Sequence, residues 1–164
     1  MDKINAAVIG TGAMGKSHAR IYSDMDNAEL VAVCDKDEKT ANEIAKKYSV
    51  KPFTDYEKID EKLDAVSVCV PTKLHKDAAL FFINKGLNVL VEKPVAGSTE
   101  EAKILIEAAK KNNAKLMVGH VERFNPVISE IKKRLENNEL GKVYSISAFR
   151  FSPFPHRIID VGVT

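Results

Sequence analysis

Tryptophan is absent from this 164-residue sequence, aromatic residues make up only 7% of it, and there are only two cysteines. Cys34 and Cys69 form no CxxC pair and lie outside any histidine cluster. Thiolate metal sites and dithiol redox centres need such groupings, so the sequence argues against both. Both cysteines lie near the ends of apolar runs, and we expect them to be small buried side chains that bind no metal.

The sequence also has no large excess of charge of one sign. It contains 25 Lys and Arg and 23 Asp and Glu, which give a formal net charge of +2. Nucleic acids and anionic membranes attract strongly basic surfaces, so neither is an expected partner. No apolar stretch approaches the ~18 residues that a membrane span requires, and Met1-Asp2-Lys3 lacks the layout of a signal peptide. We therefore expect a soluble cytoplasmic protein.

Near its start the sequence has an apolar run, residues 4–9, that is followed by glycines with GxGxxG spacing. Gly10 permits a tight turn, Gly12 lets the backbone approach a pyrophosphate, and Gly15 lets the following helix pack closely on the strand. The phosphates would then lie against unpaired N–H groups at a helix N-terminus. The pattern predicts a dinucleotide site formed by Gly10, Thr11, Gly12, Ala13, Met14 and Gly15.

An acidic residue, Asp35, stands twenty positions after Gly15 and ends a second apolar run. A carboxylate at this place accepts hydrogen bonds from the ribose hydroxyls of a dinucleotide. It would repel the extra phosphate of NADP by ~4 kcal/mol, for two unit charges 4 Å apart at an effective dielectric near 20. We therefore expect NAD as cofactor, with NADP as an alternative because Lys36 offers a cation. A plain helix-initiating acid is the competing interpretation of Asp35.

Apolar runs alternate with amphipathic stretches over residues 4–118. Strands are expected at residues 4–9, 29–34, 50–53, 65–70, 89–91 and 116–118, with helices between most of them. Such alternation predicts an α/β fold, a Rossmann doubly wound parallel sheet with strand order 3-2-1-4-5-6. We assign residues 1–121 to this NAD(P)-binding domain.

A different pattern follows, and we assign residues 122–164 to the incomplete start of a second α/β domain for substrate binding and oligomerisation. Asn125-Pro126 begins a helix with apolar residues on one face, expected to run to Gly141. Residues 142–151 alternate in the manner of a strand. A single strand cannot bury its own face, so we expect missing residues or another chain to cover it.

In an open parallel sheet the ligand lies at the carboxyl ends of the strands, where the strand order reverses. Several polar residues follow the expected strands at this edge: Pro71, Thr72 and His75 after one, Glu92 and Lys93 after the next, and His120 after the last. We predict that Pro71, Thr72, His75 and Glu92 contact the cofactor. A solvated position in the first turn of a helix is the alternative for His75, and a structural hydrogen bond is the alternative for His120.

Lys93 is the candidate catalytic residue. An amine at this position would take the proton of a substrate hydroxyl while a hydride leaves the same carbon for the nicotinamide. On the residues alone, a surface lysine paired with Glu92 or a neighbour is the stronger competing interpretation. Lys93, His120, Arg123 and Arg150 are candidates for substrate contact, and Arg123 has the alternative of pairing with an acid in the fold.

The order of these motifs resembles a known family. GTGAMG at residues 10–15, Asp35, PTxxH at 71–75, EKPV at 92–95 and GHxxRFNP at 119–126 are similar to the glucose-fructose oxidoreductase, inositol dehydrogenase and rhizopine-catabolism (Gfo/Idh/MocA) superfamily. The resemblance implies oxidation of a secondary hydroxyl of a sugar, cyclitol or nucleotide sugar, or the reverse reaction. It also implies homo-oligomers formed through a second-domain sheet, a catalytic Lys93 and a cis peptide before Pro94. The GHVERFNP wording is most similar to members that act at C3 of UDP-linked amino sugars.

The sequence departs from this family near residue 164. Family enzymes carry an aspartate and a histidine in a GxHxxD-like segment that assist the lysine, and Asp160-Val161-Gly162 resembles only the approach to it. We therefore expect the 164-residue chain to bind cofactor and to turn over weakly or not at all. Two other functions stay open. One is a non-catalytic NAD-binding sensor or interaction module; the other is an S-adenosylmethionine methyltransferase, against which Lys93 and the third glycine argue.

Overall fold

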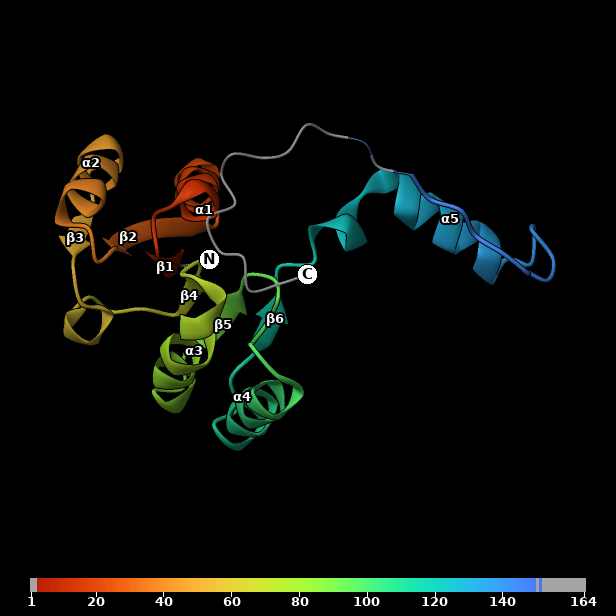
Figure 1. Cartoon of the computed structure of the whole chain (residues 1–164). Coiled ribbons are helices and arrows are strands. Elements are labelled where there is room, and N and C mark those ends of the chain that lie inside the picture. The colour runs from red at the N-terminus through yellow and green to blue at the C-terminus, as the bar shows by residue number, and fades with distance from the viewer. Residues whose placement is uncertain (1–2, 150, 152–164) are drawn as a thin grey trace. The chain divides into compact units, whose positions relative to one another are not determined.

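The computed structural model describes residues 3–149 and 151, which fall into two compact units that divide between Gly119 and His120 (Figure 1). The first unit contains all of the strands in the described part of the chain. Among the described residues, the regular elements of the second unit are all helical. Across the described residues, no helix is both long enough and apolar enough to cross a membrane.

Six strands of the first unit form one sheet. They are β1 (Ile4–Ile9), β2 (Ala28–Cys34), β3 (Lys51–Phe53), β4 (Ala65–Val68), β5 (Asn88–Val91) and β6 (Leu116–Val118). Every neighbouring pair is parallel, and the order across the sheet is β3-β2-β1-β4-β5-β6. This is the predicted doubly wound topology, and the order reverses between β1 and β4. The carboxyl ends of these two strands therefore flank the place where such folds bind ligands.

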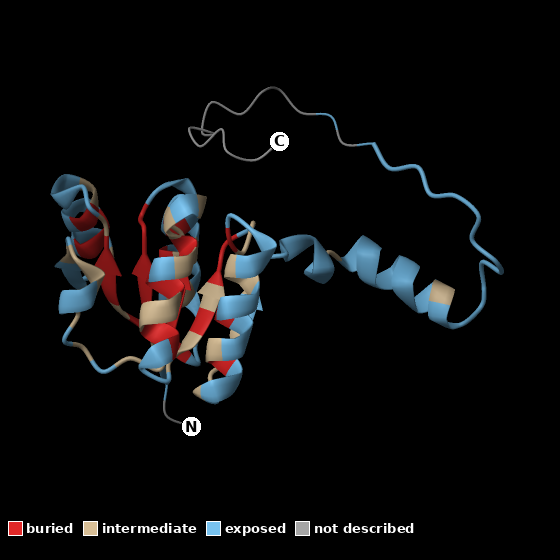
Figure 2. Cartoon of the chain, turned by 60° about the horizontal axis from the view of Figure 1, so that its bottom comes forward, coloured by how far each residue is buried: buried red, intermediate tan, exposed pale blue. Residues whose placement is uncertain are grey.

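Helices cover both faces of the sheet. They are α1 (Ala13–Asp24), α2 (Glu38–Tyr48), α3 (His75–Asn84) and α4 (Thr99–Lys111), with short 3-10 turns η1 (Tyr56–Lys58) and η2 (Thr72–Leu74). One core cluster joins the sheet to α3 and α4 and the other joins it to α1 and α2, so the two helix pairs lie on opposite faces (Figure 1). The buried residues concentrate in the strands and on the inner sides of the helices (Figure 2).

Aromatic residues on α3 pack this helix firmly against the rest of the first unit. Phe82 is 2% exposed and packs edge-to-face against Phe81, with ring centroids 5.1 Å apart, and Tyr56 adds a third ring 5.3 Å from Phe81. A buried aromatic side chain of this size contributes roughly 1.5–3 kcal/mol through burial alone. The α3 helix is therefore a firm support for the loops at the carboxyl edge.

Side chains cap two of the four helices in the way the sequence indicates. Asp37 accepts a hydrogen bond from the Thr40 amide at the start of α2, and Ser98 accepts one from the Glu101 amide at the start of α4. Thr72 begins η2, and α3 begins at His75 without a side-chain cap. Helix α1 also lacks one.

Polar residues fasten the amino ends of the strands together. Asp64 Oδ2 accepts a hydrogen bond from the Asn5 amide, while Asn88 donates to the Asp64 carbonyl and accepts from the Lys115 amide. These bonds span β1, β5 and the loops before β4 and β6. They lie at the edge of the sheet opposite the predicted ligand site, so a variant in this group serves as a control for variants at that site.

The second unit contains a 3-10 turn, η3 (Val121–Phe124), and helix α5 (Pro126–Glu136). Asn125 caps α5 by accepting a hydrogen bond from the Val127 amide, as the Asn-Pro pair indicates. The helix ends at Glu136 rather than near Gly141. The expected strand at 142–151 is not formed in residues 142–149 and 151, which are irregular and exposed. An isolated strand leaves its backbone groups unpaired, so alternation alone does not produce one.

Candidate functional site

Two of the three loop glycines are required by close packing. Gly10 has φ +87°, and a Cβ there would lie 2.7 Å from the Cys69 carbonyl carbon and the Val70 nitrogen. A Cβ on Gly15 would lie 1.8 Å from the Gly10 carbonyl oxygen. The loop after β1 therefore turns against β4, and helix α1 starts directly on top of the loop.

Gly12 is different, because a Cβ built on it would meet no atom within 4 Å. This residue is exposed and stands at the N-cap of α1, whose first turn has neither a side-chain cap nor an acidic residue. Ala13 and Met14 follow as exposed residues. The first N–H groups of α1 thus face open space at the positive end of the helix dipole. The residues present fit a pyrophosphate at this place.

Asp35 ties the end of β2 to the glycine loop. Its Oδ2 accepts hydrogen bonds from the Thr11 amide at 2.7 Å and the Thr11 hydroxyl at 3.0 Å, and its Oδ1 accepts one from the Asp37 amide. Asp37, not Asp35, caps α2. The competing interpretation of Asp35 as a plain helix-initiating acid is therefore wrong. A carboxylate offers about four acceptor positions, so capacity for ribose hydroxyls remains.

Glu92 and Lys93 follow β5 at the same edge. Glu92 is 6% exposed, and its Oε2 accepts a hydrogen bond from the Lys93 amide at 3.1 Å. The Lys93 side chain is exposed, and no ion pair involves it among the described residues. The Lys93–Pro94 peptide is cis, as the resemblance implies. Glu92 therefore does not pair with the ammonium of Lys93 and instead holds its backbone.

The residues after β4 approach the same turn. Pro71 is exposed and Thr72 is half-buried. His75 is only 2% exposed, so the alternative of a solvated position is wrong, and its contact with the cofactor stays a prediction. His75 Nδ1 lies 2.7 Å from the Pro94 carbonyl oxygen and Nε2 lies 2.8 Å from that of Val70. The ring thus bridges the segments that follow β4 and β5.

Three residues that form a hydrogen-bond network with Glu92 were not predicted from the sequence as part of the site. His18 on α1 contacts Glu92 Oε1 through Nε2 and Ser67 Oγ through Nδ1, both at 3.0 Å, and Tyr22 Oη lies 2.8 Å from Ser67 Oγ. Burial raises the pKa of Tyr22, so its hydroxyl keeps its proton and can donate. A buried serine inside an apolar strand and a histidine one turn after the third glycine were the available signals.

The other candidates belong to the second unit or lie outside the described residues. His120 precedes η3 and Arg123 lies within it, and both are exposed residues of the second unit. Arg150 lies outside the described residues. Burial raises the pKa of both Cys34 and Cys69 to about 12; Cys34 is buried as expected, whereas Cys69 is only partly so. The described residues include no group of three metal-binding side chains.

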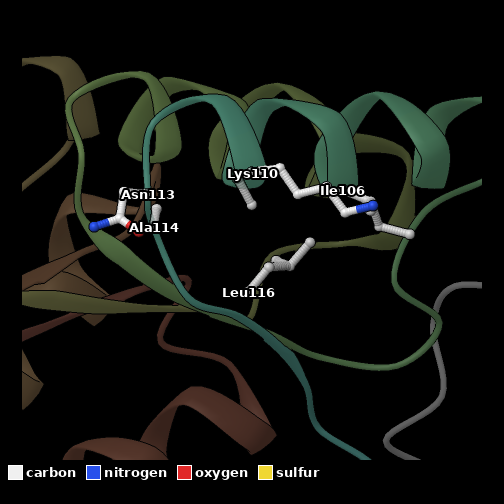
Figure 3. Close-up of a pocket in the computed structure, with 6 residues that line it drawn as sticks. Ile106, Lys110, Asn113, Ala114 and Leu116 are labelled. Atoms are coloured by element: carbon white, nitrogen blue, oxygen red, sulfur yellow. The ribbon is translucent and has the colours of Figure 1, made fainter.

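A cavity of about 460 Å³ lies elsewhere, between α4 and the amino end of β6 (Figure 3). Its lining includes Ile106, Lys110 and Leu116, and the labelled side chains come from the helix, from the loop that follows it and from the edge strand. None of the predicted site residues lines it. The glycine loop, Asp35 and the Glu92–Lys93 turn converge instead at the carboxyl ends of the central strands.

The sequence over residues 4–120 matches a family model that is described as an oxidoreductase family with an NAD-binding Rossmann fold. The chain belongs to this family. Its first unit therefore carries the NAD-binding Rossmann fold, and the resemblance to Gfo/Idh/MocA oxidoreductases is confirmed.

Individual dehydrogenases are similar to the chain over most of its length. The chain is 31% identical over 163 residues to UDP-N-acetylglucosamine 3-dehydrogenase of Acidithiobacillus ferrooxidans, covering 99% of the chain and 50% of that protein. It is 36% identical over 142 residues to glucose-6-phosphate 3-dehydrogenase of Bacillus subtilis, covering 85% and 40%. The WlbA dehydrogenase of Bordetella pertussis, solved with NADH and UDP-GlcNAcA, superposes with TM-score 0.82 at 27% identity, covering 87% and 45%. The chain spans about half the length of the curated relatives it matches.

Proposed function

We propose that this chain is the cofactor-binding part of an NAD(P)-dependent oxidoreductase that acts on a secondary hydroxyl. The observation that carries the proposal is the convergence of the open space at Gly12, the Asp35 carboxylate and Lys93 at one edge of the sheet. Each element supports a different part of one cofactor and substrate pair. None of them alone has that specificity.

The cofactor is held by the loop and the acid. Backbone N–H groups of residues 12–15 bind the pyrophosphate, and Asp35 accepts hydrogen bonds from the adenosine ribose. Because Asp35 lies beside Thr11, its charge is fixed next to that ribose. NAD is therefore preferred over NADP, whose extra phosphate would meet this carboxylate.

The chemical step requires a proton acceptor, and bound NAD supplies the acceptor of the hydride. Lys93 takes the proton of the substrate hydroxyl as the hydride leaves the same carbon, so the C–OH group becomes a carbonyl. The Lys93 amine is exposed at the carboxyl edge, while its backbone amide is bonded to the buried Glu92. The Lys93 side chain is thus accessible to a substrate, while its backbone is held in place by a hydrogen bond.

The relatives support a proposal for the substrate class. We propose a sugar, a cyclitol or a nucleotide sugar, and most specifically a UDP-linked amino sugar, because the UDP-N-acetylglucosamine 3-dehydrogenase matches nearly the entire chain. We also propose that the 164-residue chain by itself turns over weakly or not at all. Its relatives are about twice as long, and His120 and Arg123 are its only described candidates for substrate contact besides Lys93.

The test combines binding with slow turnover. The chain and its Lys93→Met variant are titrated with NADH by calorimetry and then incubated with NAD and a panel of UDP-sugars, sugars and inositols, with absorbance followed at 340 nm. We expect equal NADH affinity in both proteins. Substrate-dependent NADH formation should be slow, and at least about 100-fold slower in the variant, as is usual for the loss of a proton acceptor.

Each outcome decides a separate part of the proposal. Wild-type turnover by Lys93→Met would remove Lys93 from the chemistry. Ordinary steady-state rates from the isolated chain would overturn the expectation of weak turnover. A protein that distinguishes NAD from NADH and shows no substrate-dependent signal even when extended to the length of its relatives would be a sensor instead.

A further inference from the structure

The backbone around Lys93 is held from both faces of the sheet. His18 comes from α1 and His75 from α3, and these helices belong to the two different core clusters. His18 contacts the Glu92 carboxylate, which accepts the Lys93 amide, and His75 contacts the Pro94 carbonyl. The three consecutive residues 92–94 therefore have a hydrogen-bonded support on each side.

The hydrogen-bond directions on the His18 side form one consistent chain. An ionised carboxylate only accepts, so His18 Nε2–H donates to Glu92, and the Ser67 hydroxyl donates to the other ring nitrogen. Ser67 Oγ in turn accepts from Tyr22, whose hydroxyl lies 2.8 Å away. No buried side-chain polar atom among the described residues lacks a partner. The chain leaves the Glu92 carboxylate with one fixed orientation.

Gly119 supports the same orientation from the neighbouring strand end. A Cβ at this position would lie 2.9 Å from Glu92 Oε1 and 3.2 Å from Oε2. A side chain at residue 119 would therefore push the carboxylate away from its partners. The absence of a side chain at Gly119 makes room for the Glu92 carboxylate, with no turn or positive φ requiring it.

His75 adds a link between two strand ends. Its ring reaches the Val70 carbonyl after β4 and the Pro94 carbonyl after β5. Because β4 and β5 are neighbours and both end at the ligand edge, this bridge fixes the separation of the segments 70–72 and 92–94. Both partners are acceptors, so a neutral ring, with its single N–H, donates to one carbonyl and lies against the other. The side chain is buried, so solvent does not replace these contacts.

We propose that His18 and His75 are positioning residues, which hold residues 92–94 from opposite faces and so set the direction of the Lys93 side chain. The inference rests on the proposed function for its purpose, because the aim of Lys93 matters only if its amine moves a proton. The support itself is a property of the chain and can be tested without turnover.

The experiment uses a matched pair of variants, His18→Gln and His18→Asn. Glutamine has one amide oxygen for Ser67 and one NH₂ for Glu92, whereas asparagine has the same groups on a stem one carbon shorter and cannot reach both. Hydrogen exchange of the Lys93 amide is measured by NMR in the full chain. We expect exchange at least ten times faster in His18→Asn, and near wild type in His18→Gln.

Asn88→Ala is the control, since it removes two hydrogen bonds at the opposite edge of the sheet. It should lower the melting temperature without selective acceleration at Lys93. Gly119→Ala and His75→Leu should both accelerate exchange at residues 92–95 beyond what Asn88→Ala shows. Equal protection of the Lys93 amide in His18→Asn, His18→Gln and the wild type would overturn the role of His18, and unchanged exchange in His75→Leu would overturn that of His75.

A second readout connects the support to the cofactor. ADP-ribose lacks the nicotinamide, so the ratio of NADH affinity to ADP-ribose affinity reports on the edge near Lys93. We expect His18→Asn and His75→Leu to lower this ratio several-fold while ADP-ribose binding stays within about twofold. Loss of both ligands in equal measure would show a general structural role. No NADH binding by the wild type would refute the proposed function and leave the exchange result to decide the support.

Discussion

Replacing Gly12 with alanine separates the ligand role of the glycine loop from its structural role. The added methyl group would meet no protein atom within 4 Å, and the backbone at Gly12 has φ −66° and ψ −161°, which alanine adopts without strain. Glycine is preferred to alanine at a helix N-cap, by most of the ~1 kcal/mol that replacing a capping side chain with alanine costs. We therefore expect the free energy of unfolding to change by less than about 1 kcal/mol.

The same methyl group would occupy the space proposed for the pyrophosphate. Displacing the phosphates from one backbone N–H costs a charge-assisted hydrogen bond, roughly 1.5–3 kcal/mol. With about 1.4 kcal/mol for each factor of ten, NADH should bind about 10- to 100-fold more weakly. Calorimetric titration measures the affinity, and denaturant unfolding of the same sample measures the stability.

Gly15→Ala is the matched contrast, because its methyl group would lie 1.8 Å from the Gly10 oxygen and would force α1 off the loop. It should destabilise the fold by about 1–3 kcal/mol or more as well as weaken binding. The reasoning is refuted if Gly12→Ala binds NADH as tightly as the wild type, or if it unfolds as readily as Gly15→Ala.

Two further predictions concern other residues. Asp35→Asn should weaken NADH binding more than NADPH binding, because the charge facing the ribose is removed; titrations with both cofactors check this, and an unchanged ratio would exclude Asp35 from the choice. The thiols of Cys34 and Cys69 have native pKa values of about 12 against an ordinary 9.0, so the unfolded chain loses these protons first and stability falls as pH rises from about 9 toward 12. At pH 10 the loss should be about 1 kcal/mol per thiol, measured by denaturant unfolding, and a Cys34→Ala, Cys69→Ala double variant should lose less over the same range.

The sequence predicted the topology well because the signals were local. Glycine spacing and the alternation of strands and helices are each set by residues within a few positions of one another. The 3-2-1-4-5-6 order then follows from the handedness and connection rules of parallel sheets. Spacing likewise singled out the proposed site residues Gly10, Gly15, Asp35 and Glu92, which stay predictions as cofactor contacts.

The features that the sequence did not predict depend on contacts between residues far apart in the chain. His18 and Glu92 are 74 positions apart, and His18 and Ser67 are 49 apart, so no local pattern connects them. His75 was read as a possible solvated residue because its burial depends on Val70 and Pro94. The expected strand at 142–151 failed for the opposite reason, since alternation describes a surface that needs a partner.

The most direct test of the account is a ¹H–¹⁵N NMR titration of the chain with NADH. We predict saturable one-to-one binding, with the largest amide shifts at residues 10–15 and further shifts at Asp35 and Lys93. Folded protein whose spectrum does not change, or changes only around the cavity between α4 and β6, would contradict the claim that the loop after β1 binds a dinucleotide.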